Sequence, residues 1–377
     1  MALRPTSLLS CLVSSALLTI LAWAVIKNDS VLKAAGKYIC MFLALIVARI
    51  LLPVEFGFTV TFPSRYVLTG LRDLLLSAVG FGAFEATVGQ VLLFLWIAGA
   101  MCRFFICAGR HIYFRHKMEK CPGYFKHDVK AVIDRINREY GKGGEFKVLL
   151  VPGIQTPTIF GVLHPLILMP GVDYTEGEIY YILKHEMLHY YHWDVLVGVI
   201  CEALCIVYWW NPAVFLLERL IARVQELRVD GMLVSGFSEE EKTGYLECIA
   251  KSMRAGKQER TSLMITFVSQ RGEAMRQRLR FICEGCWTRT GWKGILAAVM
   301  ACLLFAASVS VIVEPDYGED LPGTFGHPDP KTSYLIEKDG CYEAYVDGEF
   351  VGEVLEITVP FTELKVYKNE EELTNEE

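Results

Sequence analysis

Long apolar runs alternate with polar segments along this chain. Four runs approach the length that crosses a membrane, at residues 7–26, 38–54, 88–109 and 294–313. Because a helix of about 20 apolar residues spans the hydrocarbon core of a bilayer, each run predicts a transmembrane helix. The first run resembles a secretory signal, but no small-residue cleavage site follows it, so we expect an uncleaved helix.

The short loops between these runs differ in charge, and the difference predicts an orientation. Lysine and arginine collect on the cytoplasmic side of a membrane protein. The loop after the first run holds three lysines, and the segment after the third run is rich in arginine and lysine, whereas residues 55–87 hold only two arginines. We therefore expect residues 110–293 to be cytoplasmic, and the N-terminus and residues 314–377 to lie outside.

Shorter patterns organise the predicted cytoplasmic segment. Apolar residues at helical spacing predict an amphipathic helix over residues 128–140. Short runs with β character, separated by proline and glycine, predict a small sheet at residues 146–151, 158–162 and 166–169. Thr175, followed three residues later by Glu178, has the pattern of a capping box and predicts the start of the next helix.

That helix carries a chemical motif, His185-Glu186-Met187-Leu188-His189. Imidazoles four residues apart project from one helix face and can hold one zinc ion. The glutamate beside the first histidine can accept a proton from the water that attacks a peptide carbonyl, because zinc lowers the pKa of that water to about 7. We therefore expect His185 and His189 as metal ligands and Glu186 as the catalytic base.

A third ligand is expected from a second helix, because catalytic zinc takes three protein ligands and leaves one position open. Glu226 and Asp230 lie four residues apart, on one face of a helix predicted over residues 212–234. We expect Glu226 to complete the ligand set and Asp230 to accept the N–H of a ligand histidine. The alternative is that both acids are charges on a solvated helix face.

The apolar run between the two motifs, residues 195–208, must then turn back before it crosses the membrane. As a helix, this run and its flanking residues measure about 24 Å, short of the bilayer core. Asn211-Pro212 has the pattern of a helix start. We predict a helical hairpin over residues 194–235 that dips toward the membrane, with two tryptophans at its tip and Glu202 facing the protein interior.

Composition supports a mixed architecture and excludes several classes of protein. With 53% hydrophobic residues among 377, the chain is too apolar for a soluble protein and too polar to lie wholly in lipid. A net charge of −6 gives no reason to expect nucleic acid as a partner. The 12 cysteines are scattered, so a disulfide scaffold is not expected.

Several local sequences within residues 156–235 together resemble one known family. They are Phe160-Gly161, the stretch from Pro165 to Pro170, the stretch from Ile182 to Tyr190, Asp194, Trp210-Asn211-Pro212, Glu226 and Asp230. This combination is similar to the BlaR/MecR family of membrane-embedded zinc peptidases. The resemblance implies a gluzincin-type domain at the cytoplasmic face of a bacterial membrane, with Glu226 as third ligand. It also implies cleavage of the chain itself and of a cytoplasmic repressor, and it is compatible with a homodimer.

Two departures limit what the resemblance implies. Val229 stands where the family usually has a cysteine that is not a ligand. The antibiotic sensors of the family end in a penicillin-binding domain with a Ser-x-x-Lys nucleophile, whereas residues 314–377 are too few for that fold and contain no such tetrad. Residues 342–354 instead predict a hairpin, with residues 364–367 as a further strand, in a small β module. Beta-lactam sensing is therefore not expected.

Taken together, these patterns predict an α-helical membrane protein with an α+β zinc peptidase domain and a small C-terminal β module. Its expected parts are three transmembrane helices in residues 1–109, the peptidase domain in 110–293, a fourth helix at 294–313 and the module at 314–377. The expected function is a zinc endopeptidase that transduces a signal by cleaving itself and a cytoplasmic regulator. The alternatives are a housekeeping membrane metallopeptidase of the heat-shock or CAAX-processing type, and a receptor or scaffold with a structural zinc site.

Overall fold

The computed structural model describes twelve segments of the chain. These are residues 5–53, 59–64, 67–81, 84–124, 128–154, 156–257, 265–284, 292–315, 332–338, 341–346, 348–354 and 364–367. The chain divides into two units. The larger comprises Met1–Thr61 and Ala78–Ile312, and the smaller comprises Phe62–Ser77 and Val313–Glu377.

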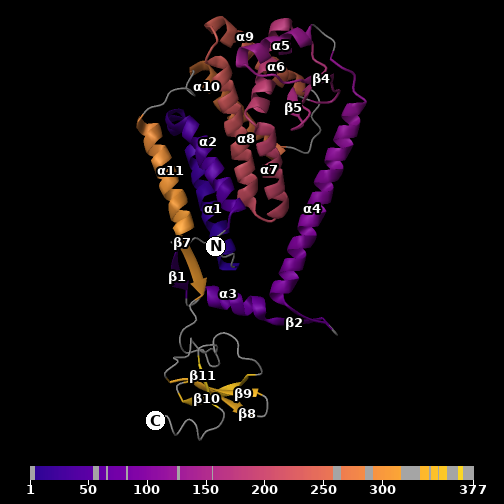
Figure 1. The fold of residues 1–377 in the computed structure, drawn as a ribbon. Helices are drawn as coiled ribbons and strands as arrows, with labels where there is room; N and C mark the ends of the chain where they lie inside the picture. The colour runs from indigo at the N-terminus through magenta and orange to yellow at the C-terminus, as the bar shows by residue number, and fades with distance from the viewer. Residues whose placement is uncertain are drawn as a thin grey trace. The chain divides into compact units, whose positions relative to one another are not determined.

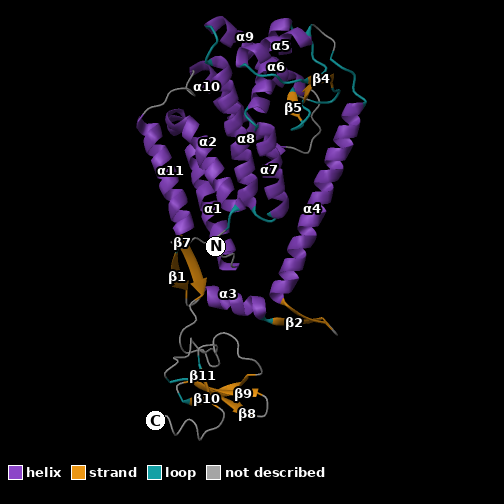
Figure 2. Ribbon diagram, viewed as in Figure 1, coloured by secondary structure: helices purple, strands orange, loops and turns teal. Residues whose placement is uncertain are grey.

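The larger unit is mainly helical, as Figures 1 and 2 show. Its helices are α1 (Pro5–Lys27), α2 (Asp29–Leu51), α4 (Val88–Glu119), α5 (Val129–Tyr140), α6 (Glu176–Tyr191), α7 (Asp194–Val207), α8 (Pro212–Val234), α9 (Glu239–Lys257), α10 (Ile265–Glu284) and α11 (Trp292–Ser310). A short antiparallel pair, β2 (Ala78–Phe81) and β3 (Phe84–Thr87), precedes α4.

Two helices among the described residues, α1 over Ser7–Lys27 and α4, are long and apolar enough to cross a membrane. Helices α6 and α7, bent by 60° at a short break, would count as a third span if they were one broken helix. The other two predicted runs also form helices, but the apolar part of α11 covers only Gly294–Ser310, and α2 begins with charged residues. The count of four spans therefore stays a prediction.

Helices α7 and α8 form the hairpin that the sequence predicts, and they pack with α1 and α2 in one apolar core (Figure 1). Asn211 begins α8, because its side-chain oxygen accepts the Ala213 N–H at 2.9 Å. Helix α8 buries Val214, Leu217 and Leu220 in this core, which α10 and α11 also join. Close packing of this kind holds helices together within lipid, where the hydrophobic effect is weak. The core thereby fixes the helix that carries Glu226.

The turn of the hairpin carries Trp209 and Trp210, which are 39% and 51% exposed. The prediction that Glu202 faces the protein interior is wrong. Its side chain is 43% exposed and pairs with Arg110 of α4, with the guanidinium nitrogen 2.8 Å from the carboxylate. A carboxylate among apolar helices costs least where a cation can reach it, and α4 supplies that cation on the outer side of α7.

A three-stranded sheet supports helix α6. Its strands are β4 (Lys147–Leu150), β5 (Thr158–Phe160) and β6 (Leu166–Met169), in the order β4-β6-β5. Strand β6 pairs parallel with β4 and antiparallel with β5, where Ile159 lies opposite Ile167. Ile167 packs with Ile136 of α5 and with Ile179 and Leu183 of α6 in a buried cluster. The predicted sheet and amphipathic helix are therefore confirmed, and both hold α6.

The start of α6 is also as predicted. The Thr175 hydroxyl accepts the Glu178 N–H at 3.3 Å, and the Glu178 carboxylate accepts the Thr175 N–H at 2.7 Å. These reciprocal bonds satisfy two backbone donors that would otherwise lack a partner at the helix terminus. The capping box thereby sets the residue at which the motif helix begins.

The smaller unit contains α3 (Val67–Leu76) and a four-stranded sheet. The strands are β8 (Tyr334–Lys338), β9 (Cys341–Val346), β10 (Glu349–Val354) and β11 (Lys365–Tyr367), in the order β10-β9-β8-β11. Strands β9 and β10 pair antiparallel where the sequence predicts a hairpin, and β11 pairs parallel with β8. Strand β8 was not predicted. The remaining strands, β1 (Val60–Ser64) and β7 (Val311–Pro315), form a two-stranded sheet.

Candidate active site

Helix α6 presents the three motif residues on its buried side. His185, Glu186 and His189 are 7%, 8% and 8% exposed. Their burial follows from the sheet and α5 on one side of the helix and from α8 and α9 on others. Polar groups that are this deeply buried need partners, because each would otherwise lose its hydrogen bonds to water.

Helix α8 brings Glu226 to the two histidines. His185 Nε2 and His189 Nε2 lie 3.1 Å apart, and they lie 3.6 and 3.5 Å from the Glu226 carboxylate oxygens. Atoms that each bind one cation at about 2 Å are separated by distances of this size. Two imidazole nitrogens and one carboxylate oxygen are a donor set that suits zinc. The residues expected as metal ligands are therefore brought together, and their geometry fits such an ion.

The second nitrogen of His189 is held by an aspartate that the sequence analysis did not assign to the site. Asp194 Oδ2 lies 2.8 Å from His189 Nδ1, and Arg228 of α8 donates to the other oxygen of Asp194. Asp194 is the first residue of α7, directly after the left-handed Trp193, whose φ is 63°. The signal in the sequence was an acidic residue five positions after the second histidine, at the break between the two helices.

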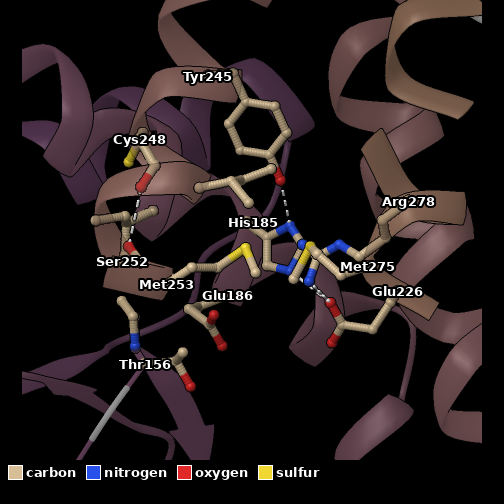
Figure 3. Close-up of a pocket in the computed structure, with 13 residues that line it drawn as sticks. Thr156, His185, Glu186, Glu226, Tyr245, Cys248, Ser252, Met253, Met275 and Arg278 are labelled. Atoms are coloured by element: carbon tan, nitrogen blue, oxygen red, sulfur yellow. Dashed lines mark hydrogen bonds and ion pairs between the residues drawn. The ribbon is translucent and has the colours of Figure 1, made fainter. Parts of the chain in front are cut away.

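The second nitrogen of His185 meets two oxygens. The Tyr245 hydroxyl lies 2.9 Å from His185 Nδ1, and Asp230 Oδ1 lies 3.3 Å from it. Tyr245 also donates to Asp230 Oδ1 at 2.6 Å. Asp230 therefore lies against His185, and Tyr245 of α9 shares the contact (Figure 3). No spacing in the sequence indicated Tyr245, because it comes from a different helix.

Arg278 of α10 contacts both carboxylates of α8. Its Nη1 lies 2.6 Å from Glu226 Oε2, and its Nε and Nη2 donate to Asp230 at 2.6 and 3.0 Å. Burial by itself would raise the pKa of Glu226, but Arg278 and the two imidazoles hold that pKa well below its usual value. Glu226 is therefore an anion, as a metal ligand must be.

The pKa of Glu186 is shifted in the direction opposite to that of Glu226. Burial raises the pKa of its carboxyl group, although the nearby imidazoles act in the other direction. No hydrogen bond to another described side chain is found for Glu186, and its carboxylate borders a cavity of about 180 Å³ (Figure 3). A carboxyl group with a raised pKa beside a cavity is suited to accept and return a proton.

The cavity has a mixed lining. His185, Glu186, Glu226 and Arg278 line it near the metal position, Thr156 and Ser252 add polar groups farther away (Figure 3), and the apolar residues include Ile182, Ile249, Met253 and Met275. A concave site of this composition can hold an apolar side chain of a ligand next to reactive groups.

Comparison with known proteins identifies one family that this chain matches. The family model described as BlaR1 peptidase M56 matches residues 82–282, a stretch that contains every site residue described above. The regulatory protein BlaR1 of Bacillus licheniformis is 26% identical over 180 residues, which are 46% of this chain and 30% of that protein. The methicillin resistance mecR1 protein of Staphylococcus aureus is 21% identical over 211 residues, 54% of this chain and 36% of that protein. The chain thus spans about a third of the length of these curated relatives.

Proposed function

The chain belongs to the BlaR1 peptidase M56 family, and from this premise we propose that it is a membrane-embedded zinc endopeptidase. Membership implies a metallopeptidase in a membrane. The observation that carries the finer proposal is the cluster of His185, His189 and Glu226, whose ligand atoms all lie within 4.8 Å of one another. A structural zinc site is closed by four protein ligands, whereas three ligands beside a cavity and a carboxylate are typical of a catalytic site.

In this proposal the two histidines and Glu226 would hold the zinc ion, which when bound would polarise the peptide carbonyl and acidify water. Glu186 accepts the proton of the attacking water and delivers it to the leaving amine. Asp194 holds the His189 ring by its Nδ1, and Tyr245 with Asp230 holds the His185 ring in the same way. Each Nε2 lone pair is thereby kept toward the metal position.

We further propose that the peptidase transduces a signal by cleaving itself, between the peptidase domain and α11, and by cleaving a cytoplasmic regulator or repressor. Two of its relatives are named a regulatory protein and a methicillin resistance protein, and the first name supports a role in regulation. In the proposed arrangement, residues 1–109 form three spans, residues 110–293 form the cytoplasmic peptidase with the hairpin 194–235, and residues 294–313 form a fourth span. Residues 314–377 would be an outer module.

The experiment compares the wild type with Glu186→Gln and Glu226→Gln, each expressed in bacterial membranes with a C-terminal tag. We expect the wild type to produce a shortened tagged fragment. Glu186→Gln should keep its zinc and lose at least about 100-fold in cleavage, because it lacks only the proton acceptor. Glu226→Gln should lose both zinc and cleavage.

Two matched variants control for the loss of a carboxylate as such. Glu176→Gln lies at the exposed start of the same helix as Glu186, and Glu247→Gln is an exposed residue of α9. Both should cleave as the wild type does. Identical fragment patterns in the wild type and Glu186→Gln, with zinc bound in both, would remove the claim of self-cleavage.

A further inference from the structure

Arg278 is one of the site residues that the peptidase motifs do not explain. It lies on α10, 52 positions after Glu226 and 48 after Asp230 (278 − 226 and 278 − 230). Its side chain is only 18% exposed. All three guanidinium nitrogens contact carboxylates, Nη1 contacting Glu226 and the other two contacting Asp230. In Figure 3, Arg278 lies beside Glu226, and Thr156 lies on the other side of the cavity.

The two carboxylates near the metal position, those of Glu226 and Asp230, require a nearby cation such as Arg278. Glu226 and Asp230 are one turn apart on α8, and Asp230 is 1% exposed. Like charges at this spacing repel each other, and a buried carboxylate without a cation is strongly destabilising. Arg278 supplies a permanent positive charge whether or not a metal ion is present.

The two oxygens of Glu226 are therefore not equivalent. Oε2 contacts Arg278 Nη1 at 2.6 Å and lies 3.6 Å from His185 Nε2, whereas Oε1 has no contact with Arg278 and lies 3.5 Å from His189 Nε2. We propose that Arg278 is a positioning residue. It holds Glu226 by Oε2, so that Oε1 is the oxygen that binds the metal ion. This inference rests on the proposed function, since it takes His185, His189 and Glu226 as the ligands of a divalent cation.

Arginine is suited to this role by its shape as well as its charge. A planar guanidinium can bind Asp230 through two nitrogens and still direct the third nitrogen at Glu226. A lysine ammonium is a single point of charge and cannot span both carboxylates in one fixed plane. Arg278→Lys therefore preserves the charge balance, so it should fold, but it should lose the orientation of Glu226.

The experiment measures metal binding directly in the purified full chain in detergent. Zinc affinity is determined by competition with a chromophoric chelator, and Co²⁺ absorption reports the coordination geometry. We expect Arg278→Lys and Arg278→Gln to bind zinc about 10- to 100-fold more weakly than the wild type, which is the usual effect of removing a group that orients a ligand. The Co²⁺ spectrum of Arg278→Lys should also change.

Arg280→Gln is the matched control. Arg280 lies two residues further along the same helix and pairs with Asp29 of α2, away from the metal position. Its loss removes an ion pair of α10 without touching a ligand, so zinc affinity should stay within about twofold of the wild type. An Arg278→Lys protein that melts like the wild type, with unchanged zinc affinity and Co²⁺ spectrum, would overturn the inference. Failure of the wild type to bind either metal would instead refute the proposed metal site.

Discussion

Each imidazole of the site has its Nε2 near Glu226 and its Nδ1 against an oxygen of another side chain. His189 Nδ1 is bound by Asp194, and His185 Nδ1 is bound by Tyr245 and Asp230. A histidine bound through Nδ1 to an oxygen acceptor carries its proton there, and its Nε2 is left as an acceptor. The partners of Nδ1 thus strengthen the Nε2 atoms as acceptors for a cation.

Asp194→Asn tests this dependence at one residue. The amide can still form a hydrogen bond, but it loses the negative charge that makes His189 a strong ligand, and it weakens the pairing with Arg228. We expect zinc to bind about 10- to 100-fold more weakly, as measured by chelator competition. The matched variant Asp134→Asn, at an exposed position of α5, should bind zinc normally. Unchanged affinity in Asp194→Asn would show that the hydrogen bond to His189 does not support metal binding.

At the scale of elements, helix α6 sets the direction of the motif side chains. The residue at which the helix begins and the face that it buries are both fixed. The capping box at Thr175 defines the first turn. Ile179 and Leu183, both 0% exposed, then fix the rotation of the helix against the sheet. His185 follows Leu183 by two residues, and its direction is set by the same packing.

Thr175→Ala should destabilise the protein by about 1 kcal/mol, because the Glu178 N–H loses its acceptor. In a chain of this size, that loss corresponds to a decrease in melting temperature of about 2 °C, measurable by calorimetry in detergent. Thr175→Ser keeps the hydroxyl and should restore most of the stability. Equal melting temperatures for the alanine variant and the wild type would mean that packing alone defines the start of α6.

Helix α10 contacts helices α1 and α2 as well as the proposed ligands. Gln277 donates to the Ile26 carbonyl and to Asp29, at the junction of α1 and α2, and it accepts from Arg223 of α8. The next residue along the helix is Arg278, which holds Glu226 and Asp230. Two consecutive residues of α10 thus contact the junction of α1 and α2 and the proposed ligand Glu226.

At the scale of the whole molecule, the distribution of charge predicts the orientation in the membrane. Alkaline phosphatase fused after residue 377 should be active, because we expect that end of the chain outside. The same enzyme fused after residue 257 should be inactive, because the arginines and lysines around α4 keep that segment in the cytoplasm. A reversed pattern of activity would contradict the proposed arrangement of spans.

Local features of this protein were determined by the sequence itself. A spacing of four residues places His185 and His189 on one helix face in any α-helix, and Thr175 with Glu178 specifies a helix start wherever the helix packs. These two features depend only on helix geometry and on neighbours along the chain. The sequence also indicated Glu226 and Asp230, because an acidic pair at the same spacing follows the expected hairpin turn and because both residues take part in the family resemblance.

The tertiary structure decided the contacts between elements that are distant in sequence. Tyr245 and Arg278 reach the site from α9 and α10, and Arg110 of α4 draws Glu202 outward, contrary to expectation. No local pattern specifies such contacts, because they depend on which helix faces meet when the apolar core packs. The sequence alone therefore determined the proposed ligands and the base, and the packing of α8, α9 and α10 determined the charges that surround them.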